Sequence, residues 1–68
     1  MENHFRRAKS YVSTAAGVSE ETARSTLERC GFTVKTAIVM LKKGLDAGQA
    51  AQLLSENGGV IARALGEG

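Results

Sequence analysis

A chain of 68 residues can form one small domain, which would bury only about 60% of the surface it exposes when unfolded, so a deep catalytic pocket is not expected. Proline and tryptophan are absent and aromatic residues make up 4% of the chain, a composition that favours short, closely packed helices over a sheet. The net charge of +2 is too small to indicate nucleic-acid binding, and the chain has neither the run of about 18 apolar residues that a membrane span requires nor the apolar core of a signal peptide.

The first two predicted helices are separated by Gly17. Residues 4–16 form the first helix, in which Phe5, Ala8, Val12 and Ala15 recur with the helical period. Ser19 is the expected N-cap of the second helix, because its hydroxyl can accept a hydrogen bond from a free amide of the first turn. Gly31 ends this second helix.

The central predicted helix covers residues 34–43, and its apolar face consists of Val34, Ala37, Ile38 and Leu41. We expect Thr33 to cap its start through the hydroxyl, and Gly44 to end it in a left-handed conformation. Val39 and Met40 lie beside the apolar face. They are either core residues or a patch that meets another domain or subunit, and the sequence leaves both interpretations open.

A fourth helix is predicted to begin after Asp46, because Gln49 stands three residues later, where a capping box places it. Residues 57–59 mark a stop and a turn. Residues 60–65 form a short last helix, and residues 66–68 are expected to be a disordered tail.

The chain also contains an internal repeat. When it is shifted by 27 residues, the caps, apolar positions and turn glycines of the two copies match in type. The matching pairs are Val18 and Leu45, Ser19 and Asp46, Ala23 and Ala50, Leu27 and Leu54, Gly31 and Gly58, Val34 and Ile61, Ala37 and Ala64, and Ile38 and Leu65. A unit of helix, glycine turn and helix is therefore used twice, and neither copy can bury its apolar face alone. The repeat is either a paired interaction surface or a packing unit without a binding role.

The predicted fold is therefore a single all-α domain over residues 1–68, a bundle of about five short helices. It consists of a three-helix unit over residues 4–44 and a second helix-turn-helix copy over residues 45–65. The expected core residues are Val12, Val18, Ala23, Leu27, Val34, Ala37, Ile38, Leu41, Leu45, Ala50, Leu53, Leu54, Ile61 and Leu65.

No constellation of residues in the sequence indicates catalysis, a cofactor site or a metal site. One histidine and one cysteine, far apart, do not supply the convergent ligands of a zinc site. Cys30 reads as a small core residue. A single cysteine can form no internal disulfide, which is typical of the reducing cytoplasm.

Most of the chain resembles the C-terminal segment of bacterial N-acetylmuramic acid 6-phosphate etherases. The specific part is Val34-Lys35-Thr36-Ala37-Ile38-Val39-Met40-Leu41, followed by Gly44-Leu45, Ala50, Leu53-Leu54, Gly58-Gly59 and Ala64-Leu65. Residues 7–23 resemble the beginning of that segment, whereas Lys42-Lys43 departs from its more apolar or hydroxyl pair.

This resemblance implies a function for the parent protein. Such enzymes are cytoplasmic lyases that cleave the D-lactyl ether of N-acetylmuramic acid 6-phosphate, giving N-acetylglucosamine 6-phosphate and D-lactate in cell-wall sugar recycling. Their catalytic carboxylates and phosphate-binding loop belong to an N-terminal α/β domain, so none is carried onto this chain. The resemblance therefore implies an accessory domain without activity of its own, which packs on its catalytic domain or on a dimer partner.

A second resemblance concerns the stretch Cys30-Gly31-Phe32 with Val34, Ala37 and Ile38. It is similar to the Gly-Phe loop and following helix of ubiquitin-associated domains, which are three-helix bundles, although Cys30 stands where those domains usually have Met. The alternative function that it implies is a protein-binding module. Its candidate contact residues are Cys30, Gly31 and Phe32 in the loop and Val39 and Met40 near the end of the central helix.

Overall fold

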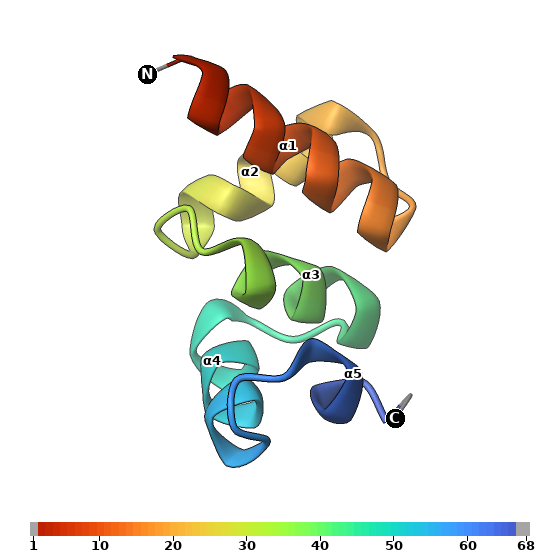
Figure 1. Cartoon of the computed structure of the whole chain (residues 1–68), viewed down its shortest axis with the longest axis vertical. Coiled ribbons are helices and arrows are strands. Elements are labelled where there is room, and N and C mark those ends of the chain that lie inside the picture. Colours follow the sequence, from red (N-terminus) through yellow and green to blue (C-terminus); the bar gives the residue numbers. More distant parts are fainter. Residues whose placement is uncertain (1, 67–68) are drawn as a thin grey trace.

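The computed structural model describes residues 2–66 of the chain, with side chains from residue 6 onward. Within this range the chain forms five helices and no strand (Figure 1). They are α1 (Glu2–Ala16), α2 (Glu20–Arg29), α3 (Val34–Lys43), α4 (Ala47–Glu56) and α5 (Ile61–Ala64). The prediction of a small all-α bundle is confirmed.

The starts of α2 and α4 have the caps that the sequence predicts. Ser19 Oγ accepts a hydrogen bond from the Thr22 amide at 3.2 Å. Asp46 Oδ1 accepts from the Gln49 amide at 2.7 Å, and the Gln49 side chain accepts from the Asp46 amide at 3.4 Å, which completes a capping box. These bonds satisfy amides that have no partner inside the helix.

The predicted hydroxyl cap at Thr33 is wrong, because its side chain makes no capping hydrogen bond to α3. Thr33 has a ψ of 107°, whereas the two capping residues, Ser19 and Asp46, have ψ values of 159° and 174°. The preceding loop therefore brings the chain into α3 at an angle that directs the Thr33 side chain differently relative to the first turn. Val60, which precedes α5, has a similar ψ of 115° and also forms no cap.

The ends of the helices differ slightly from the predicted bounds. Gly44 has a φ of 68°, the left-handed conformation expected of it. α5 is shorter than predicted, and Gly66 still donates its amide to the carbonyl of Arg63 at 3.1 Å. The other two residues of the expected tail, and the side chain of Phe5, lie outside the described residues.

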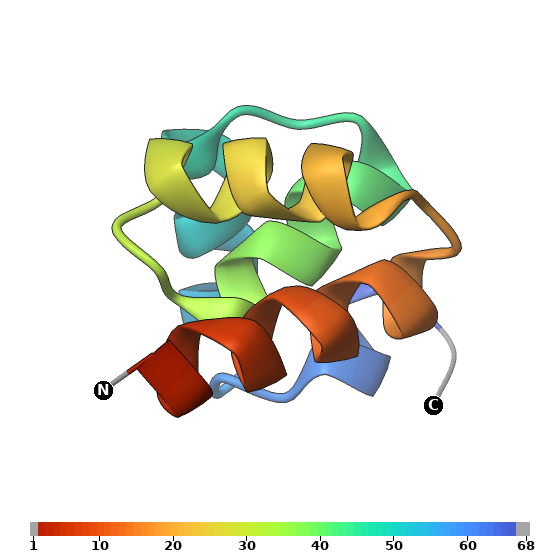
Figure 2. The same ribbon diagram turned by 90° about the horizontal axis from the view of Figure 1, so that it is seen from above.

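The apolar side chains form two clusters on opposite sides of α3. The first core lies between α1, α2 and α3, and its buried members are Val12, Ala23, Leu27, Ala37 and Ile38. The second core lies between α3, α4 and α5, and its buried members are Val39, Met40, Ala50, Leu54 and Ala64. α3 therefore runs through the middle of the molecule, with a helix layer on each side (Figures 1 and 2).

All the predicted core residues lie in one of these two clusters or against it. Val18, Val34, Leu41, Leu45, Leu53, Ile61 and Leu65 are half-buried, and the others are buried. The prediction missed Val39, Met40 and Ala64, together with the buried hydroxyl residues Thr26 and Thr36. Three of these five belong to α3, because the sequence pattern assigned that helix only one buried face.

The internal repeat extends further toward the N-terminus than the sequence comparison placed it. α1 packs against α2 and α3 in the same way as α3 packs against α4 and α5. At the same spacing of 27 residues, Val12 and Val39 are both fully buried, and Gly17 and Gly44 have φ values of 70° and 68°. The chain thus contains two three-helix units that share α3, as the last helix of one unit and the first helix of the other.

Candidate interaction site at the loop between α2 and α3

The loop between α2 and α3 contains two successive residues in the left-handed conformation. Gly31 has a φ of 69° and Phe32 a φ of 65°. The loop is closed by a hydrogen bond of 2.7 Å from the Phe32 amide to the Leu27 carbonyl, a common way to satisfy a helix C-terminus. Phe32 is the one residue other than glycine with a positive φ among residues 2–66.

The loop between α4 and α5 repeats this backbone. Gly58 and Gly59 have φ values of 68° and 76°, and the Gly59 amide donates to the Leu54 carbonyl at 2.7 Å. The second copy therefore has glycine at the position that Phe32 occupies in the first. Glycine adopts this conformation without a steric penalty, whereas a bulky side chain does not.

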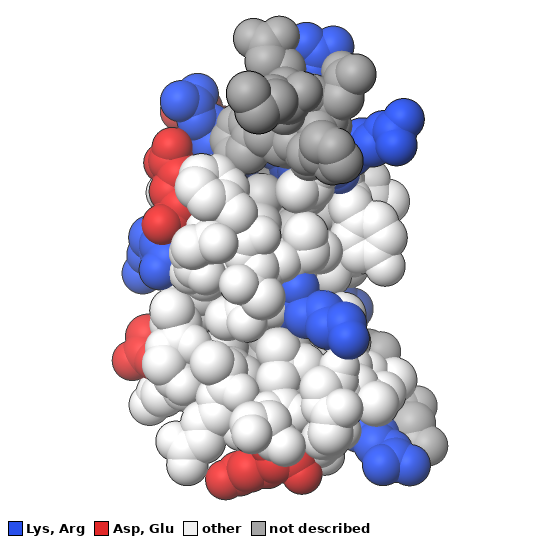
Figure 3. Space-filling model, turned by 60° about the vertical axis from the view of Figure 1, so that its left-hand side comes forward, with Lys and Arg blue, Asp and Glu red and all other residues white. Residues whose placement is uncertain are grey.

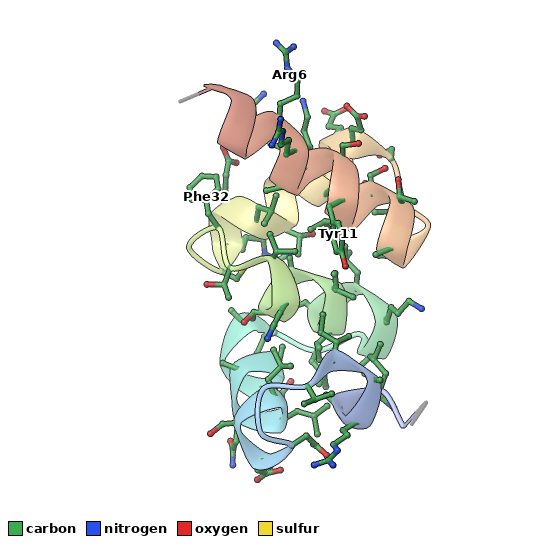
Figure 4. The ribbon with its side chains drawn as sticks, viewed as in Figure 1. Arg6, Tyr11 and Phe32 are labelled. Atoms are coloured by element: carbon green, nitrogen blue, oxygen red, sulfur yellow. The ribbon has the colours of Figure 1, made fainter. Side chains whose placement is uncertain are left out.

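Phe32 also exposes its side chain, with 52% of the residue accessible to solvent. Its ring lies at the left-hand edge of the molecule (Figure 4). The other large apolar residues that are exposed in the described chain are Tyr11 of α1, at 60%, and Val60, at 44%. Of these three, only Phe32 combines exposure with a positive φ.

Cys30, which precedes this loop, is half-buried between the two cores. Its Sγ donates to the Leu27 carbonyl at 3.6 Å and to the Thr33 carbonyl at 3.4 Å. The side chain therefore packs under the loop, as expected of a small core residue. Gly31 and Phe32 form the exposed part of the candidate contact site.

The two candidate contact residues of α3 do not lie on the surface. Val39 is fully buried and Met40 is 5% exposed, and both belong to the second core. Their assignment as contact residues needs correction, because α4 and α5 cover the face of α3 that carries them. The sequence did not separate core from patch here, since the second buried face of α3 becomes apparent only with the overlap of the two units.

A long-range hydrogen bond links the two loops. Lys35 Nζ, from the first turn of α3, donates to the Gly59 carbonyl at 3.0 Å. When the left-hand side of the molecule is brought forward, uncharged side chains occupy most of the visible face, with a basic side chain near its middle and acidic groups toward its edges (Figure 3). The Phe32 loop lies on this side of the molecule (Figure 4).

The rest of the described surface contains no cluster that is typical of a catalytic or metal site. Among residues 2–66, no three His, Cys, Asp or Glu side chains are grouped closely enough to hold a metal ion. A shallow, open depression of about 440 Å³ lies where α1, α3 and α5 end, and it is lined by Ala16, Leu41, Lys42, Lys43 and Leu65. None of the five helices, as far as they are described, has the length and apolar character needed to cross a bilayer.

Sequence comparison finds relatives among N-acetylmuramic acid 6-phosphate etherases. The chain is 48% identical over 62 residues to the enzyme from Deinococcus radiodurans, which is 91% of this chain and 20% of that protein. It is 48% identical over 59 residues to the enzyme of Bacillus subtilis strain 168, covering 87% of this chain and 19% of the relative. N-acetylmuramic acid 6-phosphate etherase 1 of Vibrio cholerae is 44% identical over 63 residues, covering 93% of this chain and 21% of the relative.

The chain thus spans about a fifth of the length of the curated relatives it matches. The resemblance to these etherases is confirmed for a segment of the enzyme, not for its whole length. No family model matches the chain, and no solved structure matches it either. The similarity to ubiquitin-associated domains stays a prediction.

Proposed function

We propose that this chain is a helical accessory segment of an N-acetylmuramic acid 6-phosphate etherase, and that it packs against the catalytic part of that enzyme or against a dimer partner. The observation that carries the proposal is the 48% identity to the Deinococcus radiodurans etherase over 91% of this chain and only 20% of the relative. The parent reaction would be the cleavage of the D-lactyl ether in the cytoplasm, with release of D-lactate.

The placement of the acidic side chains supports a structural role over a catalytic one. All the described carboxylates, those of Glu20, Glu21, Glu28, Asp46 and Glu56, belong to exposed residues. Two of them pair with basic side chains at the surface, Lys9 with Glu20 at 3.8 Å and Arg24 with Glu28 at 3.6 Å. General acid–base catalysis requires a group that is positioned beside the reacting atoms, and isolated surface carboxylates do not supply it.

The proposal can be tested with the Deinococcus radiodurans etherase as host. Three proteins are compared: the native host, the host without the segment that matches this chain, and a chimera in which this chain replaces that segment. D-lactate release from N-acetylmuramic acid 6-phosphate is measured for each protein and for the 68-residue chain alone. We expect no release from the chain, a loss on deletion of the segment, and recovery in the chimera.

A chimera with Leu27→Asp is the matched control, because Leu27 is fully buried in the first core and a carboxylate there prevents the helices from packing. This control is expected to resemble the deletion. Release of D-lactate by the isolated chain, or a native chimera no better than the deletion, would contradict the proposal.

A second candidate function, a protein-binding module of the ubiquitin-associated type, is favoured by the exposed ring of Phe32. Titration of isotopically labelled chain with ubiquitin distinguishes it. Chemical-shift changes confined to Cys30, Gly31 and Phe32 would support this alternative, and a spectrum that does not change would reject it.

A further inference from the structure

The two copies of the loop provide an internal comparison for Phe32. Gly31 and Gly58 have nearly the same φ, 69° and 68°, and the next residue is also left-handed in both copies, with 65° at Phe32 and 76° at Gly59. Both loops are closed by a 2.7 Å hydrogen bond to the carbonyl five residues earlier. The backbone therefore requires the same conformation at both positions, and only the side chain differs.

Phe32 destabilises its own loop. A left-handed conformation costs a residue with a Cβ atom roughly 1–2 kcal/mol, a cost that glycine at the same position in the second copy does not have. Burial of the ring within this chain does not offset the cost fully, because Phe32 is 52% exposed. A strained residue with an exposed aromatic ring is typical of a position that is stabilised by a surface outside the chain.

The size of this contact favours a partner that is covalently attached. A phenylalanine side chain buries about 150–250 Å², whereas a stable complex between separate proteins buries about 800 Å² on each partner. A contact of that size is sufficient when a linker holds the two surfaces at a millimolar effective concentration. The relatives contain such a partner, because the matching segment is 20% of the Deinococcus radiodurans etherase and the other four fifths belong to the same polypeptide.

We propose that Phe32 anchors this segment by inserting its ring into an apolar pocket on the remaining part of its own etherase chain. This inference rests on the proposed function and names the residue through which the segment docks. The uncharged side chains on the same side of the molecule form the surface that surrounds the anchor (Figure 3).

The first arm of the test measures strain in the isolated chain. Replacing Phe32 with glycine, the residue of the second copy, is expected to raise the Tm by about 4 °C, because the left-handed conformation is then unstrained. A Tm that falls would overturn the inference, since Phe32 would then stabilise the chain by itself. The same sample in sedimentation experiments shows whether two chains associate through Phe32, which would also overturn it.

The second arm uses the chimera with the Deinococcus radiodurans etherase. Phe32→Gly is expected to lower D-lactate release about tenfold and to increase hydrogen exchange of the loop amides, although the segment itself is more stable. Phe32→Leu, which keeps an apolar side chain, should retain most of the release. Val60→Gly, at an exposed apolar residue beside the second loop, should leave it unchanged.

The outcomes separate the two proposals. A chimera in which Phe32→Gly releases D-lactate as fast as the native chimera would overturn the anchor and leave the accessory function intact. A native chimera that is no better than the deletion would overturn both. Opposite effects of Phe32→Gly, a stabilised chain and an impaired chimera, are the result that supports the inference.

Discussion

At the scale of single residues, two valines illustrate how position determines the contribution of the same side chain. Val39 is fully buried in the second core, while Val60 is 44% exposed at the start of α5. Deleting methyl groups from a packed core removes apolar burial and leaves a cavity, whereas neither effect applies at the surface.

Val39→Ala should therefore lower the free energy of unfolding by about 2 kcal/mol. Val60→Ala, the matched control, should change it by less than about 0.5 kcal/mol. Urea denaturation followed by circular dichroism measures both. Equal effects of the two substitutions would mean that Val39 is not a core residue and would restore it as a candidate contact residue.

At the scale of the elements, the helices begin in two different ways. α2 and α4 begin at side-chain caps, whereas α3 and α5 follow loops with two left-handed residues and begin without one. The helices that lack caps depend on packing against their neighbours. α3 has ten residues and packs on both sides, and α5 has only four.

Two substitutions at equivalent helix starts test this difference. Asp46→Ala removes the capping box of α4 and should lower the free energy of unfolding by about 1 kcal/mol. Thr33→Ala should change it by less than about 0.5 kcal/mol, because the Thr33 side chain caps nothing. A loss at Thr33 as large as the loss at Asp46, measured by denaturant titration, would contradict the structural assignment.

These starts also indicate what the sequence could predict. Ser19 and Asp46 were identified as caps because an N-cap is a local pattern. The failure at Thr33 has a physical cause, since ψ at that residue depends on the loop before it. The left-handed conformation of Phe32 contradicts the preference of a bulky residue, and only its alignment with Gly59 in the repeat carries the signal.

At the scale of the whole molecule, the shared use of α3 joins the two cores into one structure. Its first face, with Ala37 and Ile38, completes the first core, and its second face, with Val39 and Met40, begins the second. This overlap was readable from the sequence, because Val12 and Val39 stand at the repeat spacing. The sequence analysis missed it because it began the repeat at Val18, after α1.

A truncated chain of residues 1–44 tests the dependence of the first unit on the second. Without α4 and α5, Val39 and Met40 become exposed, at a cost of about 3–6 kcal/mol in lost apolar burial. We expect this fragment to lose most of its helical circular dichroism.

The control is the same fragment with Thr36→Arg and Met40→Glu, which copy the residues found at the matching positions of the second copy, Arg63 and Glu67. It should recover helicity. A native fragment that folds as well as the full chain would show that the two units are independent.

The overlap of the units has a consequence for the lengths that such an architecture permits. Three helices make the smallest member, and each extension adds one helical hairpin of 27 residues, because the preceding helix already supplies the third wall. Copying residues 18–44 once more behind Gly44 would therefore yield a seven-helix array in which both interior helices are covered on two sides. Lengthening by any other increment would leave an apolar stripe facing water.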